Sequence, residues 1–419
     1  MVRTPFRTLV AISIGMLGLC RGPAAEAQPA PNVGTPASRA LLDELVKLAR
    51  ERAPEVRFGR AALVASRASQ ARARLAPFEN PLVEVKVDRG TRGVTRDVTI
   101  DASVWLPVEV AGQRSSRRRE AASYVRVHEA TLEQARALAT GRTVRAFGLL
   151  AVATTRARVL EELEAVARAE SDYYAARVAA GDATERDAAL AALEAARHEA
   201  LLGETQSDIV EGAGELFELT GWKPSEGAVF EAVPPEAMVK KLLSSGLLAT
   251  PATAVLERRA AYHAASAERL AREAWPALGV AVTGGRGDFG EARVGAGVAY
   301  ALPLFRSNQP ARAEAQAERV RALDELEVTR DLVRQRAAVI TRELAALERA
   351  LDVITRSALP AATRAVSAAS ETHRAGKGDW LAVLVSRREL SALSLRRLEL
   401  LEKSWSLLGE LSEMTGEVP

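Results

Sequence analysis

Two stretches of the chain alternate between apolar and polar side chains. Between residues 82 and 105, two such runs flank a glycine-bearing turn, and residues 278–301 repeat the arrangement. Alternation with a period of two predicts strands with one apolar and one polar face. Each run holds roughly nine or ten residues, enough to cross a membrane when the strand is tilted. A soluble hairpin with one buried face would show the same pattern, so the strands alone leave both environments open.

Long helices are predicted for most of the remaining chain. Residues 110–180 contain no proline, and a helix over this whole segment would be about 105 Å long. Counting alternately three and four residues onwards from Val125 gives mainly apolar residues, many of them alanine. This spacing predicts the narrow apolar row of a coiled coil. The row is interrupted at even intervals by His128, Arg142, Arg156 and Glu170. These residues either face a tunnel or set the helix register, and we favour the second interpretation. In the matching helix of the second half, Pro360 predicts a bend.

The second half of the chain repeats the first. Pro81 and Pro276 differ by 195 positions, as do Gly181 and Gly376. This unit is far longer than a solenoid repeat and indicates an internal duplication of a helix–strand–strand–long helix–helix unit. We expect a first repeat at 38–221, with strands at about 82–105 and a helical hairpin at about 110–220. A connector at 222–250 leads to a second repeat at 251–419, with strands at about 278–301 and a helical hairpin at about 310–415.

The first 27 residues have the pattern of a secretory signal peptide. A basic start precedes an apolar core at 9–19, and Ala25-Glu26-Ala27 forms an A-x-A cleavage site. Residues 28–37 are rich in proline, alanine and glycine and predict a loose leader. Cleavage after Ala27 would remove Cys20, the one cysteine of the chain, and leave no thiol for disulfides or catalysis. Acylation of Cys20 as a lipoprotein is the alternative. Either way, the sequence predicts an exported protein.

Charge and residue types argue against several functions. The net charge is only +3, and no basic block interleaves with aromatic residues, so we expect no nucleic-acid partner. Gly284-Gly285-Arg286-Gly287 precedes a strand rather than a helix, unlike a phosphate-binding loop. No two of the four histidines have metal-ligand spacing along a helix; they are His128, His198, His263 and His373. We therefore predict no enzyme, no cofactor and no metal site.

The four strands cannot cross a membrane as a single copy, because open sheet edges would leave backbone groups unpaired in lipid. Two copies would give about eight strands, whose interior side chains fill, whereas three would give about twelve and leave a lumen. In each repeat the helix before the strand pair and the helix after it both join the strands at the same end, opposite the turn. The helices of all copies would then project to one side and continue the barrel as a hollow rod.

Several motifs in this order resemble the TolC-type outer membrane efflux proteins, over essentially the whole mature chain. They are Ala53-Pro54-Glu55-Val56, Leu302-Pro303-Leu304-Phe305 before Asn308-Gln309, Arg177…Gly181 and Arg374…Gly376. Residues 303–317 look most like the heavy-metal and cation efflux branch. The resemblance implies a mainly α protein with a small membrane β-barrel. Three chains would close a twelve-stranded barrel on a long α-helical coiled-coil tunnel.

The resemblance also implies a function and partners. The homotrimer would lie in the outer membrane of a Gram-negative bacterium, in contact with its lipid, with a large periplasmic part. It would be the exit duct of a tripartite efflux pump, passively conducting metal cations, or otherwise drugs or small organic molecules. Its partners would be a periplasmic adaptor (membrane fusion) protein and an inner-membrane efflux transporter of the RND type. A soluble periplasmic coiled-coil scaffold or adaptor is the alternative, although two hairpins and two strand pairs disfavour it.

Candidate site residues follow from the same resemblance. The two helical turns would be periplasmic tips that dock the adaptor, with Arg177, Gly181, Asp182, Thr184, Arg374, Gly376, Lys377, Gly378 and Asp379. Some family members carry entrance aspartates where this chain has Ala382 and Val385. Asp187 and Asp379 are candidate substitutes for such a gate, although helix capping explains both. Trp105 and Tyr300, at strand ends, are expected at the membrane interface.

Overall fold

The computed structural model describes residues 37–76, 80–92, 95–223, 232, 250–286, 291–303 and 307–417. The predicted signal peptide with Cys20, nearly all of the leader and most of the connector lie outside the described residues. None of the described helices is both long enough and apolar enough to cross a membrane.

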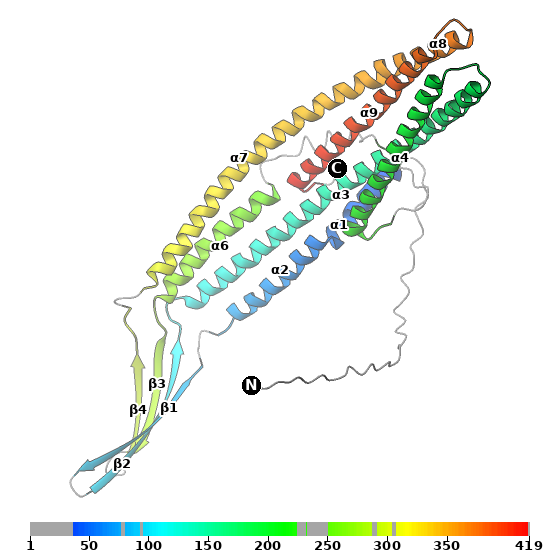
Figure 1. Ribbon diagram of the computed structural model, residues 1–419. Helices are drawn as coiled ribbons and strands as arrows, with labels where there is room; N and C mark the ends of the chain where they lie inside the picture. The colour runs from blue at the N-terminus through cyan, green and yellow to red at the C-terminus, as the bar shows by residue number, and fades with distance from the viewer. Residues whose placement is uncertain are drawn as a thin grey trace, which may run out of the picture.

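The protein is a long bundle of helices with a narrow sheet at one end (Figure 1). The sheet contains β1 (Leu82–Arg92), β2 (Thr95–Val108), β3 (Leu278–Arg286) and β4 (Ala292–Ala299). In the first half the helices are α1 (Ala37–Arg52), α2 (Pro54–Ala73), α3 (Gln113–Ala179) and α4 (Glu185–Thr220). In the second half they are α6 (Pro251–Glu273), α7 (Gln309–Val353), α8 (Leu359–Arg374) and α9 (Trp380–Thr415).

All four strands form one antiparallel sheet in the order β1-β2-β3-β4, so β2 and β3 join the two halves of the chain. The register aligns the apolar positions across the sheet in the row Val83, Val104, Val282 and Ala296. The neighbouring positions form the polar row Glu84, Ser103, Thr283 and Gly295. One face of the sheet is therefore apolar over its whole width. Along the described strands, β1 and β4 each leave one edge unpaired.

The two strand-end aromatics lie on different faces. The sequence predicts Trp105 at a membrane interface, but the register puts its indole on the polar face, where it donates a hydrogen bond to Ser103 Oγ at 3.1 Å. Trp105 has the parity of Asp101 and Ser103 along β2, and its place at a membrane interface stays a prediction. Tyr300 directly follows β4, and by sequence parity it continues the row of Val294 and Val298.

The helices keep the order of the strands to which they connect. Next to the sheet, α3 packs between α2 and α6, and α7 packs on the other side of α6. In the half far from the sheet, α3 packs between α4 and α9, and α8 packs on α9 (Figure 1). The lateral edges of this far half are thus α4 on one side and α7 with α8 on the other.

A glutamine marks the place where each long helix begins. Gln113 Oε1 accepts a hydrogen bond from the Ala111 N–H at 2.8 Å, and Gln309 Oε1 accepts one from the Ser307 N–H at 3.0 Å. Beside Gln309, Asn308 has a left-handed backbone with φ 56° and donates through its amide to Leu270 O at 3.2 Å. The Asn308-Gln309 motif therefore fixes the start of α7 against the end of α6.

The predicted bend at Pro360 is associated with a π-helical turn. Residues Ile354–Ala358 form this turn between α7 and α8, and the Leu359 N–H bonds to Ile354 O, five residues earlier. A proline ring clashes with the carbonyl of the preceding turn and cannot donate to it. The widened turn just before Pro360 lets the helix continue towards the far end.

Three of the four polar residues that interrupt the apolar row of α3 pair with other helices, and the fourth, His128, contacts a residue of α3 itself. Arg142 binds Glu55 of α2 at 3.2 Å and Glu215 of α4 at 3.3 Å. Arg156 binds Asp208 of α4 at 3.5 Å and Glu402 of α9 at 2.6 Å. Glu170 pairs with Arg387 of α9, and the His128 ring stacks edge-on against Tyr124. These pairs support the interpretation that the interruptions set the register.

Candidate functional site

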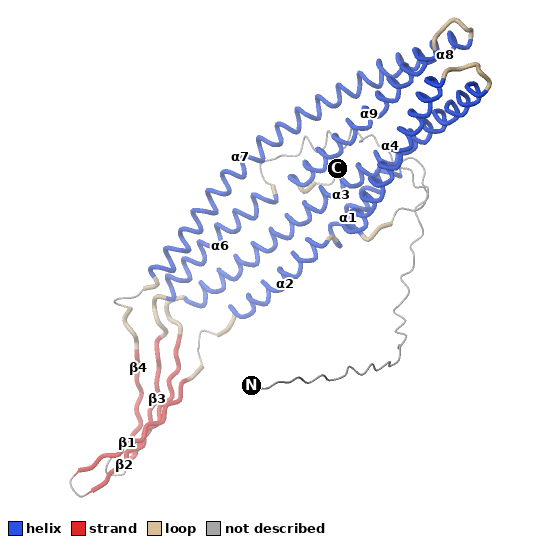
Figure 2. The backbone as a smooth tube through the Cα atoms, viewed as in Figure 1, coloured by secondary structure: helices blue, strands red, loops and turns tan. Residues whose placement is uncertain are grey.

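The two turns predicted as tips lie at the end of the bundle farthest from the sheet (Figure 2). In the first turn, Gly181 has φ 79°, a left-handed conformation that glycine adopts without strain. The Asp182 N–H donates to Arg177 O at 2.8 Å, and the Arg177 guanidinium donates back to Asp182 O at 2.9 Å. One backbone hydrogen bond and one side-chain hydrogen bond between Arg177 and Asp182 thus hold the turn together.

Thr184 and Asp187 cap the start of α4. Thr184 Oγ1 accepts from the Asp187 N–H at 3.2 Å and donates to the Asp187 carboxylate at 2.7 Å. The same carboxylate accepts from the Thr184 N–H at 3.4 Å. Asp187 thus completes the reciprocal capping box that the sequence predicts. Its role as a gate remains a proposal.

The second turn has the same construction. Gly376 has φ 70° and donates its N–H to His373 O at 2.9 Å, while the Lys377 N–H donates to Thr372 O at 3.0 Å. Asp379 Oδ1 accepts from the Leu381 N–H at 3.3 Å and caps α9. Arg374 and Lys377 are exposed. The surface of this turn therefore carries two positively charged side chains beside a glycine with a left-handed backbone conformation.

An aromatic cluster that the sequence did not predict joins the two turns. Tyr174 of α3 is only 4% exposed, and its ring centroid lies 4.6 Å from that of Trp380 at the start of α9. The Tyr174 hydroxyl lies 3.5 Å from His373 Nε2, and His373 Nδ1 lies 3.1 Å from Gly378 O. Burial raises the pKa of Tyr174 to about 12. Both contacts fit the tautomer in which Nδ1–H donates to Gly378 O and Nε2 accepts from the phenol.

Trp380 carried the signal that could have identified this cluster. The chain has only five tryptophans, and one of them directly follows the predicted helix cap Asp379. A large aromatic side chain at the first position of a helix, next to a turn, needs a partner to bury it. The partner lies about two hundred positions away in sequence, so periodicity alone could not identify Tyr174.

Adjacent arginines of α9 bind the first hairpin behind the tips. Arg387 pairs with Glu170 of α3, and Arg388 Nε bonds to Glu194 of α4 at 2.9 Å. The buried His198 lies 3.6 Å from the same Glu194 carboxylate. Burial lowers the pKa of His198, partly opposed by Glu194. Among the residues with described positions, no group of three His, Cys, Asp or Glu side chains is placed to hold a metal ion.

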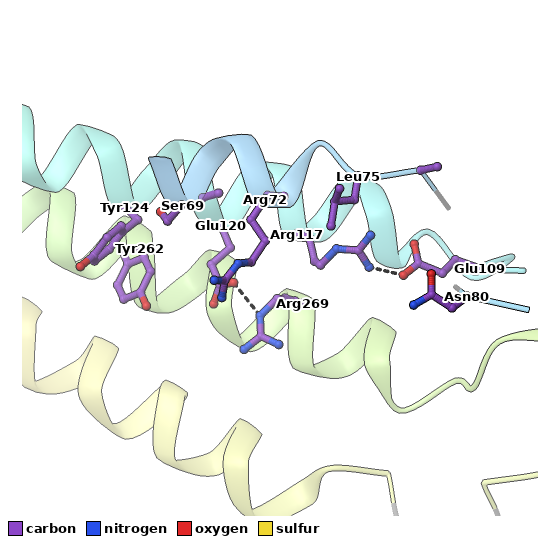
Figure 3. Close-up of a pocket in the computed structure, with 13 residues that line it drawn as sticks. Ser69, Arg72, Leu75, Asn80, Glu109, Arg117, Glu120, Tyr124, Tyr262 and Arg269 are labelled. Atoms are coloured by element: carbon purple, nitrogen blue, oxygen red, sulfur yellow. Dashed lines mark hydrogen bonds and ion pairs between the residues drawn. The ribbon is translucent and has the colours of Figure 1, made fainter. Parts of the chain in front are cut away.

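A second feature lies at the junction of the sheet and the helices (Figure 3). A cavity of about 1030 Å³ is lined by α2, α3 and α6. Two ion pairs line it: Arg117 binds Glu109, and Arg269 Nε binds Glu120 at 2.6 Å. Tyr124 and Tyr262 stack with centroids 5.5 Å apart. The Arg269–Glu120 pair links α6 to α3, and the Arg117–Glu109 pair links α3 to the segment that follows β2, so these ion pairs hold the elements around the cavity together.

Comparisons with known proteins agree with this geometry. No family model matches the chain. The outer-membrane channel OprN superposes with a TM-score of 0.70 at 19% identity, covering 91% of each chain. The outer membrane protein VceC of Vibrio cholerae superposes with a TM-score of 0.71 at 18% identity, covering 90% of this chain and 97% of VceC. In sequence, the cobalt-zinc-cadmium resistance protein CzcC of Cupriavidus metallidurans is 26% identical over 347 residues, 80% of this chain and 81% of CzcC. This chain is a CzcC homologue with the TolC-type outer-membrane channel fold.

The homology to CzcC and the shared fold confirm the predicted fold class and function. The protein is an outer-membrane exit duct for efflux, neither an enzyme nor a soluble scaffold. Its helical bundle is the large periplasmic part that is typical of such channels. The alternative of a soluble periplasmic scaffold or adaptor is therefore wrong. The roles of the individual tip residues remain predictions.

Proposed function

We propose that three copies of this CzcC homologue form one pipe that conducts divalent metal cations from the periplasm to the exterior. The substrate class is supported by the name of its relative CzcC, which refers to cobalt, zinc and cadmium. Conduction is passive, and an inner-membrane transporter of the RND type supplies the energy. Drugs or small organic molecules are the second candidate cargo.

The sheet is the observation that carries this proposal. It has four strands, one apolar face and an unpaired edge on each of β1 and β4. Pairing β4 of one copy with β1 of the next satisfies both edges, and three copies close at about twelve strands, enough to enclose a lumen. The two unpaired edges and the four strands of each copy thus support a homotrimer whose barrel needs no strand from another protein.

The apolar face is the lipid face in this assembly. Val85, Ile100 and Val282 would meet hydrocarbon, and the row that contains Glu84 and Ser103 would line the lumen. Tyr300 then lies at the lipid interface, as the sequence predicts, while Trp105 faces the lumen.

The two turns are the docking surface for the periplasmic adaptor. Gly181 and Gly376 have no neighbouring heavy atom within 4 Å of an added Cβ, so both face open space. Arg374 and Lys377 offer positive charge beside them. We expect Lys377→Glu to weaken adaptor binding and leave the trimer intact. Gly181→Val and Gly376→Val should do the same, although the positive φ adds strain to these two variants.

A deletion strain tests the cargo. Loss of the gene should raise the cell content of cobalt, zinc and cadmium, and the intact gene should restore export. A strain with unchanged metal content and increased sensitivity to organic drugs would show that the second cargo is correct. Unchanged export of both classes would reject the proposed function.

A further inference from the structure

The outer side of α7 carries a second apolar row that the described residues of its own chain leave exposed. Its members lie at intervals of seven residues and are exposed: Leu332, Val339, Ala346 and Val353. Leu332 is 59% and Val353 is 60% exposed. The contacts of α7 with its own chain use a different face, which includes Leu326, Ile340 and Leu344. A heptad-spaced apolar row on a long helix is one half of a coiled-coil contact.

A second exposed heptad row lies on α4. It consists of Ala189, Ala196, Gly203, Val210 and Phe217. Val210 is 73% exposed, although it is β-branched and apolar. The contacts of α4 with α3 involve another face, where Gly212 lies against Leu150. Both lateral edges of the far half therefore expose an apolar row.

The two rows are flanked by opposite charges with the same spacing. On α4 the flanking residues are Glu204, Glu211 and Glu218, and on α7 and the adjoining π-helical turn they are Arg342, Arg349 and Arg356. All six side chains are exposed. Across the described parts of the chain, Glu204, Glu211, Arg342 and Arg349 make no ion pair. Glu218 lies 4.0 Å from Arg142, and Arg356 pairs only within its own helical segment, with Asp352.

The charged rows also lie at matching distances from the tips. Glu204, Glu211 and Glu218 lie 19, 26 and 33 residues after Glu185, the first residue of α4. Arg356, Arg349 and Arg342 lie 18, 25 and 32 residues before Arg374, the last residue of α8. The two tips are adjacent, since Tyr174 packs on Trp380. Copies related by rotation about an axis parallel to the helices have their tips at the same level along that axis. The carboxylate row of one copy therefore lies at the same level as the arginine row of the next copy.

We infer that α4 of one copy packs antiparallel against α7 of a second copy, with Glu204, Glu211 and Glu218 facing Arg356, Arg349 and Arg342. This inference rests on the proposed trimer and names its periplasmic contact. Large and small apolar residues alternate across the contact: Phe217 opposes Val339, Val210 opposes Ala346 and Gly203 opposes Val353. Opposite charges flanking an apolar row fix both the register and the choice of partner.

Cysteine crosslinking in the assembled protein tests the contact. The double variant Glu211→Cys with Arg349→Cys should give a disulfide-linked dimer and trimer on a non-reducing gel after mild oxidation. The matched control is Glu211→Cys with Glu348→Cys, because Glu348 is exposed at the same height on another face of α7. We expect at least tenfold less crosslinking in this control and in each single-cysteine variant.

Charge reversal gives an independent measurement. Arg349→Glu should lower the temperature at which the detergent-purified trimer dissociates, and adding Glu211→Arg should restore it. Each variant is compared with Glu348→Arg, which should leave that temperature unchanged.

The outcomes separate this contact from the trimer itself. An intact trimer without the crosslink between positions 211 and 349 would overturn the inference and leave the proposed function standing. A monomer in detergent would overturn both. A maleimide reagent tests whether position 211 is covered in the trimer of the Glu211→Cys variant. If the cysteine is labelled in the trimer and only added adaptor protects it, the adaptor rather than a second copy covers this surface, and the inference is wrong.

Discussion

Gly148 of α3 lies directly against the indole of Trp405 in α9. A Cβ added to Gly148 would lie 2.2 Å from Trp405 Cγ, so only glycine allows the two helices to cross this closely. The indole is buried, stacks edge-on against Phe147 with centroids 5.9 Å apart, and donates to Ala232 O at 2.7 Å. One tryptophan thus joins the two hairpins and a residue from the connector.

The glycine predicts a sharp difference between two substitutions. Gly148→Ala should destabilise the protein by about 1–3 kcal/mol, because the added methyl must displace a packed ring. The matched variant Gly214→Ala, in an exposed helix position with nothing within 4 Å, should stabilise it by about 0.5–1 kcal/mol. Thermal unfolding in detergent measures both changes. Equal effects of the two variants would contradict the close crossing.

The buried tyrosine predicts loosening of the tips at high pH. Burial raises the pKa of Tyr174 from 10.0 to about 12, so folding favours the neutral phenol. Its contribution to stability is complete below pH 10 and is lost as pH rises through about 12. Protection of the tip amides, measured relative to the intrinsic base-catalysed exchange rate at each pH, should fall over this window in the native protein, and Tyr174→Phe should remove this fall. An unchanged pH profile in Tyr174→Phe would show that another group titrates.

The buried histidine predicts the opposite behaviour in acid. Burial lowers the pKa of His198 from 6.5, so the folded protein favours the neutral ring. This contribution to stability is present above about pH 6.5 and is lost as pH falls towards the depressed pKa. As the pH is lowered from 7.5 to 5, the melting temperature of His198→Gln should fall less than that of the native protein. An unchanged slope in His198→Gln would show that another group carries the acid dependence.

The two faces of the sheet predict different tolerance of charge. Ile100→Arg, on the apolar face, should impair membrane insertion by about 2–4 kcal/mol near the bilayer midplane. Glu84→Arg, on the polar face, should insert normally because its side chain would meet water in the lumen. Membrane fractionation followed by carbonate washing measures insertion. If both variants insert equally, the assignment of the faces is wrong.

Local signals in the sequence predicted most elements, and tertiary contacts account for what was missed. Alternation located the strands, while Thr184 and Asp379 marked the caps at which α4 and α9 begin. The contact of Tyr174 with Trp380 depends on how two hairpins pack, which no local pattern records. The polar face on which Trp105 lies is by contrast readable from the sequence, because Trp105 and Ser103 are two positions apart on the same strand.

In the proposed trimer, the two open edges of the sheet also set how fast finished channels appear. A newly exported chain cannot enter the bilayer alone, because its open edges would leave backbone groups unpaired, so insertion waits for two further copies. The rate of insertion then rises more steeply than in proportion to the supply of exported chains. A modest drop in secretion would cost the cell a much larger share of its working pores.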